Sequence, residues 1–280
     1  MREITYEQIA EAVSRLCVEA NVKLGEDVQN ALRQAKEREQ SPVAGEVLSQ
    51  LLQNAAIAAD EYVPMCQDTG MAVFRVELGQ DCRVAGGSLY AAINEGVRRG
   101  YRDGYLRASV VRDPLQRVNT GDNTPAVIHV ELVEGDSCTI YMTAKGFGSE
   151  NMSRLQMLAP SDGMEGVKRF VVETVRLAGP NACPPVVVGV GLGGNFELAA
   201  YLAKKALFRP IGERHQREDL ARLELELMES INRLGIGPQG MGGSTTALDV
   251  HVELYATHIA ALPVAVNINC HASRHKHVVL

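Results

Sequence analysis

The stretch MCQDTGMAVFRVEL, residues 65–78, marks the point at which the sequence changes from a helical to a strand pattern. Before it, apolar residues recur at helical spacing in three segments, residues 4–20, 26–37 and 42–60. After Gly70, the run Met71–Leu78 has the apolar and β-branched composition of a strand. Residues 1–62 are therefore predicted to be a mainly helical subregion, and a sheet is predicted to begin after them.

The rest of the chain alternates between the two patterns. A helix is predicted over residues 88–103, and strands over 126–133 and 138–143 form an expected hairpin around the turn at 134–136. Asp162 and Glu165 resemble a capping box that opens a helix ending before Gly179. Further on lie a strand at 185–191, helices at 196–208 and 213–233, a glycine-rich loop at 235–243 and a strand at 262–268. We expect a mixed α/β (α+β) fold in one domain, residues 1–280, with a helical N-terminal subregion followed by a mixed sheet packed with helices.

Composition excludes several classes of protein. Of the 280 residues 46% are hydrophobic, and the net charge of −6 gives no basic surface for nucleic acid or anionic lipid. The first twenty residues mix charged and apolar positions, unlike a signal or transit peptide. No segment reaches the roughly 18 apolar residues of a membrane-spanning helix. We therefore expect a cytoplasmic protein with neither nucleic acid nor membrane as a partner.

The six cysteines fall into different contexts. There is no CxxC pair, which argues against a zinc ribbon or a thioredoxin motif, and a reducing compartment favours thiols or metal ligands over disulfides. Cys17 and Cys138 lie on apolar faces and are predicted core residues, whereas Cys82 is undecided. The other three stand at the edges of predicted elements: Cys66, Cys183 and Cys270. Three such thiolates could hold an iron–sulfur cluster, or they could be unrelated buried thiols.

Two glycine motifs invite a nucleotide interpretation. Gly189, Gly191 and Gly194 form GxGxxG after a strand, but no second strand precedes Glu213, as a dinucleotide site would require. The segment GMGGSTT, residues 240–246, lacks the lysine of a phosphate loop. A glycine-rich turn leading into the N-terminus of a helix is enough to explain it.

Six segments together resemble one known family. CQDTG (66–70), KGFGSENMSRLQML (145–158), NACPPVVVGVG (181–191), ALFRPIG (206–212), GIGPQGMGG (235–243) and LPVAVNINCHASRH (262–275) are similar, in the same order, to segments of the class I, iron–sulfur-dependent fumarate hydratases. The resemblance covers nearly the whole chain. It implies that Cys66, Cys183 and Cys270 hold a 4Fe-4S cluster whose fourth iron is open to substrate.

The resemblance also implies a subunit arrangement. Because the sequence stops ten residues after Cys270, it resembles the alpha subunit of a two-subunit enzyme. The expected partner is a fumarase beta subunit, in a hetero-oligomer of alpha and beta chains that acts on a dicarboxylate.

Several polar residues would carry the chemistry. Gln67 and Asp68 follow Cys66 directly, so the resemblance places both in the substrate pocket, with Asp68 in a catalytic role in proton exchange. Without a cluster, the same residues are simply an Asx turn entering a strand. Arg107 is the expected bidentate ligand of a substrate carboxylate, with Arg112 as its rival.

The loop KGFGSEN and the C-terminal end supply further candidates. Gly146 and Gly148 could bring bare backbone close to substrate, or could simply form a strand-to-helix turn. His271, Arg274, His275 and His277 crowd the last ten residues. We expect His271 beside the cluster ligands and the others against a partner chain, the alternative being a flexible solvated tail.

The predicted function is reversible hydration of fumarate to malate by an iron–sulfur hydro-lyase alpha subunit. An L-tartrate dehydratase alpha subunit is the first alternative, ranked below fumarate because KGFGSENMS is closer to fumarases. A non-catalytic iron–sulfur assembly or regulatory protein is the second. No residue is assigned as the base for the carbon-bound proton, which could belong to the beta subunit.

Overall fold

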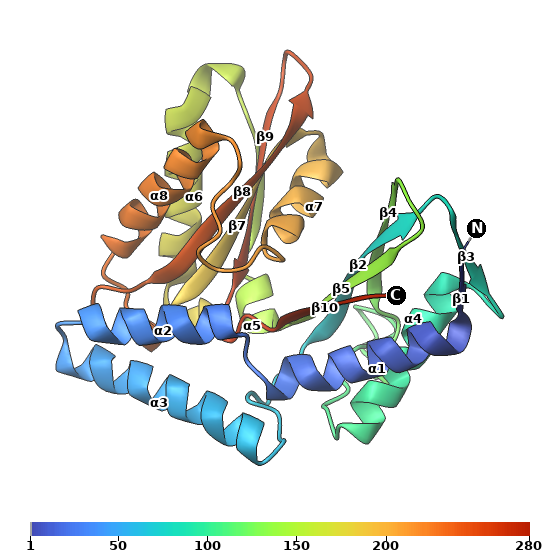
Figure 1. The fold of residues 1–280 in the computed structure, drawn as a ribbon. Coiled ribbons are helices and arrows are strands. Elements are labelled where there is room, and N and C mark those ends of the chain that lie inside the picture. The colour runs from blue at the N-terminus through green and yellow to red at the C-terminus, as the bar shows by residue number, and fades with distance from the viewer. Residues whose placement is uncertain (1) are drawn as a thin grey trace. The chain divides into compact units, whose positions relative to one another are not determined.

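The computed structural model describes residues 2–280, which form two compact units (Figure 1). Unit 1 comprises the chain up to Gly25, Asn54–Phe147 and Arg274–Leu280, and unit 2 comprises Glu26–Gln53 and Gly148–Ser273. The mixed α/β class with a helical N-terminal region is confirmed. The single domain expected for residues 1–280 stays a prediction.

Unit 1 is a four-stranded sheet with two helices on one face. The strand order is β10 (His275–Val279), β5 (Cys138–Lys145), β2 (Met71–Gly79) and β4 (Val127–Val133). Helices α1 (Tyr6–Val22) and α4 (Leu89–Asp103) bury their apolar faces against it, and Cys17 and Cys138 belong to this core as predicted. A small parallel pair, β1 (Arg2–Thr5) and β3 (Cys82–Ala85), completes the unit.

The predicted hairpin between β4 and β5 is wrong, because β2 lies between them. β2 pairs with β4 in parallel and with β5 antiparallel. The connecting turn instead crosses the end of β2, where Gly79 N donates to Ser137 O (2.8 Å). A Cβ on Gly79 would stand 2.4 Å from the carbonyl oxygen of Gly135, so this crossing requires a glycine.

The C-terminal end is a strand rather than a flexible tail. β10 pairs antiparallel with β5, with His275 opposite Thr143 and His277 opposite Tyr141. The rings of Tyr141 and His277 lie with their centroids 5.5 Å apart. Arg274, just before this strand, is only 2% exposed.

Unit 2 is a second four-stranded sheet, in the order β6 (Arg154–Leu158), β9 (Leu262–Asn269), β7 (Val186–Gly194) and β8 (Ala247–Thr257). Helices α6 (Gly163–Ala178) and α8 (Glu218–Asn232) cover one face, and α7 (Phe196–Ala206) covers the other (Figure 1). The unit also contains α2 (Glu26–Arg38), the first part of α3 (Pro42–Asp60) and the turns η1 (Pro160–Asp162), η2 (Gly179–Ala182) and η3 (Pro238–Gly240). The short α5 (Phe147–Glu150) begins at the boundary.

The GxGxxG motif packs a helix against a strand. A Cβ on Gly189 would stand 2.1 Å from Ala203 O, and one on Gly191 would stand 2.1 Å from Ala199 O, both on α7. These glycines therefore let α7 approach β7 closely. No strand separates α7 from α8, so the argument against a dinucleotide site is confirmed.

Two local predictions in unit 2 are wrong. Asp162 does not cap α6, because its carboxylate accepts from the N–H of Ala159 (2.9 Å) in the turn before it. The segment GMGGSTT leads into strand β8 rather than into a helix. It therefore lacks the helix N-terminus that would attract an anion.

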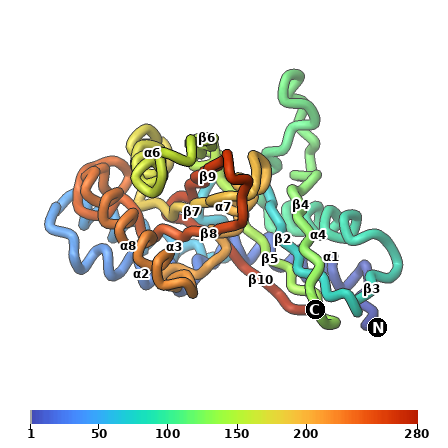
Figure 2. The backbone as a smooth tube through the Cα atoms, turned by 90° about the horizontal axis from the view of Figure 1, so that it is seen from above, coloured from blue at the N-terminus to red at the C-terminus, as the bar shows by residue number. Residues whose placement is uncertain are grey.

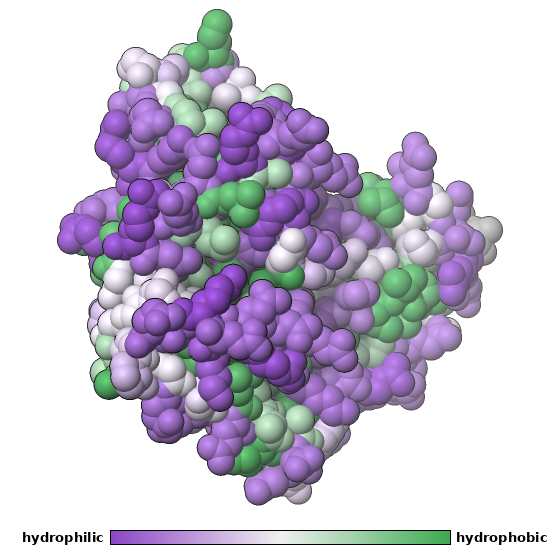
Figure 3. Space-filling view, turned by 60° about the vertical axis from the view of Figure 1, so that its left-hand side comes forward, coloured by the Kyte–Doolittle hydropathy of each residue, from purple (hydrophilic) through white to green (hydrophobic). Residues whose placement is uncertain are grey.

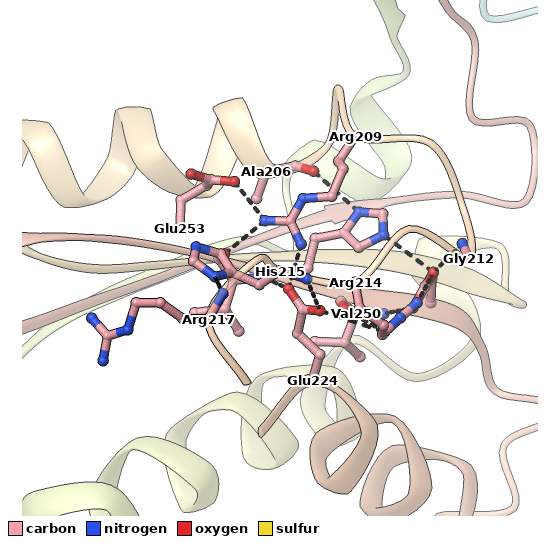
Figure 4. A network of polar contacts seen from close by, with 12 residues as sticks. Ala206, Arg209, Gly212, Arg214, His215, Arg217, Glu224, Val250 and Glu253 are labelled. Atoms are coloured by element: carbon pink, nitrogen blue, oxygen red, sulfur yellow. Dashed lines mark hydrogen bonds and ion pairs between the residues drawn. The ribbon is translucent and has the colours of Figure 1, made fainter. Parts of the chain in front are cut away.

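Buried charges anchor the ALFRPIG segment to β8 (Figure 4). Glu224 is 0% exposed and accepts from Arg209 Nη1 (2.5 Å), His215 N (3.0 Å) and Val252 N (2.9 Å). Arg209 also donates to Glu253 (2.6 Å). Three hydrogen-bond donors offset the cost of burying this carboxylate. Loss of its negative charge would leave the buried donors without a charged partner, which is destabilising.

The surface in Figure 3 is mostly hydrophilic, with small separate apolar patches. Within residues 2–280, none of the helices combines the length and the apolar character needed to span a bilayer.

The first prediction concerns Glu224. Replacing it by Gln removes the charge opposite Arg209, and we expect the free energy of unfolding to fall by about 3 kcal/mol. The matched control is Glu229→Gln on the same helix, whose partner Arg233 is exposed. That change should cost less than about 0.5 kcal/mol. Urea unfolding followed by circular dichroism measures both, and equal losses would contradict the account.

A second prediction concerns acid stability. Burial raises the pKa of Asp249, but hydrogen bonds from His251 and Arg214 outweigh burial and hold the pKa below its usual value. A lowered folded pKa stabilises the protein above the unfolded value of about 3.9, and this stabilisation is lost as the pH falls below it. We expect Asp249→Asn to be less stable at pH 7 and to lose less stability than the wild type between pH 5 and pH 3. Urea unfolding at several pH values tests this, and parallel pH curves would refute it.

Candidate active site

The turn Met65–Gly70 in unit 1 is held by side chains from distant parts of the chain. The N–H of Met65 donates to Asn21 O (3.0 Å), and Asn54 Nδ2 donates to Met65 O (2.8 Å). These contacts fix the entry to the turn between the end of α1 and the last turns of α3. The turn follows a helix and precedes β2, as the sequence predicts.

Two buried side chains hold the exit from the turn. Tyr101 OH donates to the carbonyl oxygens of Thr69 (2.8 Å) and Gly70 (3.1 Å), and burial raises the pKa of this hydroxyl. Asn123, which is 0% exposed, also donates to Gly70 O (3.1 Å). The carbonyl groups of Thr69 and Gly70 are thus hydrogen-bonded to buried side chains. A loop held in this way keeps one conformation.

Asp68 is fixed at both of its carboxylate oxygens. Oδ1 accepts from the N–H of Gly70 (3.0 Å), which is the predicted Asx turn, and Oδ2 accepts from the N–H of Phe147 (2.9 Å). The backbone carbonyl of Asp68 accepts from Arg274 Nη1 (2.7 Å). The structure therefore brings the turn, the KGFGSEN segment and the C-terminal segment together at one residue.

Arg107 lies beside Gln67, as expected for members of one pocket. Its Nη1 donates to Gln67 Oε1 (3.0 Å), and its backbone carbonyl accepts from Thr69 Oγ1 (3.1 Å). Both side chains are exposed. Arg112, the rival, belongs to the segment between α4 and β4. This segment projects beyond its own sheet in Figure 2.

Gly146 and Gly148 have close neighbours in their own units. In unit 1, a Cβ on Gly146 would lie 3.3 Å from Arg274 Nη2 and 3.5 Å from Asp68 Oδ2. In unit 2, a Cβ on Gly148 would lie 3.5 Å from Asn181 O, in the NACPP segment.

Cys183 and Cys270 lie in adjoining segments of unit 2. The carbonyl oxygen of Cys183 accepts from the N–H of His271 (3.3 Å) and lies 3.1 Å from Nδ1 of the same residue. Gln239 Nε2 also approaches His271 Nδ1 (3.1 Å) and donates to Pro184 O (2.8 Å). Cys183 itself has φ +54°, a left-handed conformation that is costly for a residue with a side chain.

A partly buried ion pair that no sequence pattern indicates anchors the turn after Gly148. Lys204 Nζ donates to both carboxylate oxygens of Glu150 (2.6 and 2.7 Å), and Asn267 Nδ2 donates to the same carboxylate (3.0 Å). Burial lowers the pKa of Lys204, although the Glu150 charge opposes this. The only signal in the sequence is an acidic residue in a glycine-rich turn, which does not identify its partner.

The two thiols predicted to lie in the core are the buried ones. Cys17 and Cys138 are 0% exposed, whereas Cys66, Cys82, Cys183 and Cys270 are half-buried. Burial raises the pKa of Cys17, and it raises the pKa of Cys138 to about 11. Thiolates are the metal-binding form of cysteine, so the four half-buried thiols are better donors than the two buried ones. Within the described residues of either unit alone, no three His, Cys, Asp or Glu side chains gather closely enough to hold a metal ion.

The comparisons with known proteins agree on one family. A family model described as "Fumarate hydratase (Fumerase)" matches residues 10–279. A Methanocaldococcus jannaschii protein, provisionally named L(+)-tartrate dehydratase subunit alpha, is 45% identical over 95% of both chains. The L(+)-tartrate dehydratase subunits alpha of Escherichia coli K12 and Shigella sonnei are each 36% identical over 95% of this chain and 89% of their own.

The contrast between thiols yields a third prediction. Brief treatment of the metal-free folded chain with iodoacetamide at pH 8 should alkylate Cys66, Cys183 and Cys270 and leave Cys17 and Cys138 unmodified, because buried thiols ionise poorly and are inaccessible. Peptide mass spectrometry reads out each site, and unfolding in urea supplies the control in which all react. Modification of Cys17 or Cys138 at the rate of the half-buried thiols would contradict the assignment.

Proposed function

Because this chain belongs to the class I fumarate hydratase family, as an alpha-type subunit of its iron–sulfur-dependent hydro-lyases, we propose that it is the alpha subunit of an L(+)-tartrate dehydratase. The observation that carries this choice is the 45% identity over 95% of both chains to a protein provisionally given that name. The KGFGSENMS segment favours fumarate, whereas the names of the relatives support tartrate. The proposal includes a separate beta subunit as the partner.

In this proposal Cys66, Cys183 and Cys270 hold a 4Fe-4S cluster. Their half-buried thiols suit this role, and the adjoining Cys183 and Cys270 segments support it for two of the three. The cluster, when bound by three thiolates, supplies one open iron as a Lewis acid for the substrate hydroxyl. Tartrate, malate and fumarate are all four-carbon dicarboxylates, so each also needs cationic and amide donors.

Gln67 and Arg107 are the proposed carboxylate-binding pair. Because Gln67 Oε1 accepts from Arg107 (3.0 Å), the NH2 group of the amide turns away from the arginine and can donate to a ligand. The exposed guanidinium of Arg107 offers further N–H groups in a planar fork that matches a carboxylate. Together they would fix one end of a dicarboxylate.

Asp68 is the proposed catalytic residue. Its carboxylate is held in one orientation by the N–H groups of Gly70 and Phe147, as a catalytic group must be. We assign to it the holding or transfer of a proton at this hydroxyl. Gly146 and Gly148 would allow bare backbone to approach the substrate.

Fumarate hydration is the second candidate, favoured by the KGFGSENMS segment, which is closer to fumarases. Removing water from tartrate leaves an enol that becomes oxaloacetate, whereas malate gives fumarate. Tartrate and malate therefore differ by one hydroxyl group at the reacting carbons. Discrimination must come from groups that bind that hydroxyl.

The fourth prediction tests this function. After anaerobic iron–sulfur reconstitution with its beta partner, the chain should form oxaloacetate from L-tartrate faster than it forms malate from fumarate. Coupled reduction of oxaloacetate and loss of fumarate absorbance measure the two rates. Cys183→Ser should abolish turnover, whereas the control Cys82→Ser should retain it.

The outcomes separate the candidates. Faster turnover of fumarate would move the assignment to fumarase. Absence of turnover with either substrate, despite a bound cluster and partner, would favour a non-catalytic iron–sulfur protein. Full activity of the alpha chain alone would refute the proposed dependence on a beta subunit.

A further inference from the structure

Arg274 is among the largest fully buried side chains of the protein, although it was expected at a partner contact or in a solvated tail. It stands just before β10, and its carbonyl oxygen accepts from the N–H of Ala144 (3.1 Å) on β5. The edge of the unit 1 sheet thus fixes its backbone. Its side chain reaches the turn that carries Asp68.

One nitrogen of the Arg274 guanidinium donates hydrogen bonds to two acceptors. Nη1 donates to Asp68 O (2.7 Å) and to Asn21 Oδ1 (2.9 Å). Asn21 is in turn held by its own bond from Nδ2 to Cys17 O (2.9 Å) inside α1. The orientation of Arg274 is therefore set by a helix on one side and by the Asp68 backbone on the other.

The arginine is not arranged for maximal hydrogen bonding. Within residues 2–280, Nε of Arg274 is buried without a hydrogen-bond partner. An idle buried donor on a charged group is costly, and such groups call for an explanation when they persist in a native structure. A role of Arg274 in positioning Asp68 would explain why this unpaired donor persists.

The surroundings of Gly146 show that the guanidinium of Arg274 and the carboxylate of Asp68 lie close together. The position of an added Cβ lies 3.3 Å from Arg274 Nη2 and 3.5 Å from Asp68 Oδ2. The absence of a side chain there lets the guanidinium and the carboxylate share one small space. The other two buried anchors, Tyr101 and Asn123, contact the turn at the carbonyl groups of Thr69 and Gly70. Among these anchors, only Arg274 binds the carbonyl of Asp68.

We propose that Arg274 is a positioning residue, which holds the backbone of Asp68 so that the side chains of Gln67 and Asp68 keep the orientation that catalysis requires. It acts through Asp68 and does not bind substrate. The assignment rests on the proposed function for its catalytic consequence. Its structural part, the ordering of the turn, can be tested without turnover.

The fifth prediction compares Arg274→Gln and Arg274→Lys with the control Arg102→Gln, an exposed arginine on α4. Hydrogen exchange of the full chain should become at least about tenfold faster at the N–H groups of Gly70 and Phe147, which bind the Asp68 carboxylate, in the Gln variant. In the reconstituted enzyme, kcat should fall about a hundredfold while KM changes less than about threefold, because misplacement of a catalytic group by about 1 Å has an effect of this size. The control should change neither quantity.

Three results would overturn the proposal. A large rise in KM with unchanged hydrogen exchange would make Arg274 a substrate ligand instead. Unchanged exchange and unchanged kcat would leave it without a positioning role. Should the Gln variant fail to fold, the Lys variant decides, since it keeps the charge but not the planar fork, and wild-type exchange and kcat in it would likewise reject the assignment.

If the wild-type enzyme turns over neither substrate, the proposed function fails. The exchange rates at Gly70 and Phe147 still report whether Arg274 orders the turn. The two failures are therefore distinguishable.

Discussion

Buried carbonyl groups must be hydrogen-bonded, and this requirement shapes the centre of unit 1. The turn from Met65 to Gly70 cannot satisfy its own carbonyls, because it belongs to neither a helix nor a strand. Asn54, Tyr101, Asn123 and Arg274 supply the donors instead. The backbone on either side of Gln67 is thus hydrogen-bonded, and the side chains of Gln67 and Asp68 are oriented by Arg107 and by the N–H groups of Gly70 and Phe147.

The packing of unit 2 depends on glycine residues and on buried charges. Gly189 and Gly191 let α7 contact β7 at backbone distance, and Glu224 and Asp249 tie the segment after α7 to β8. Both features support the same sheet, in which Cys183 precedes the central strand β7 and Cys270 follows the central strand β9. The segments carrying these cysteines meet through His271, so a rigid sheet supports a locally strained cysteine.

The two candidate substrates share the chemistry that the described residues can provide. A cation beside a turn that carries an amide and a carboxylate suits both tartrate and malate. Family membership therefore follows from the whole chain, whereas the choice between tartrate and malate depends on contacts to a single hydroxyl group. Contributions from a beta subunit would act on the same choice.

Much of this protein could be predicted from sequence alone. Local periodicity predicts the main helices and several strands, the apolar contexts of Cys17 and Cys138 predict core thiols, and the missing strand before Glu213 argues correctly against a dinucleotide site. Six segments in order indicate the family. These properties are local or belong to the family, so they survive without knowledge of the fold.

Other features depend on partners that are distant in sequence. Adjacency along the chain predicts a β4–β5 hairpin, but β2 takes the place between them because a crossing turn can pack on Gly79. A cluster of basic residues at the end of a chain is typical of a solvated tail, yet Arg274 is buried against Asp68. The sequence by itself determined the main helices, several of the strands, the family and the candidate residues. Only the tertiary structure decided strand order and which donor satisfies which carbonyl, because these pairings join residues that no local pattern connects.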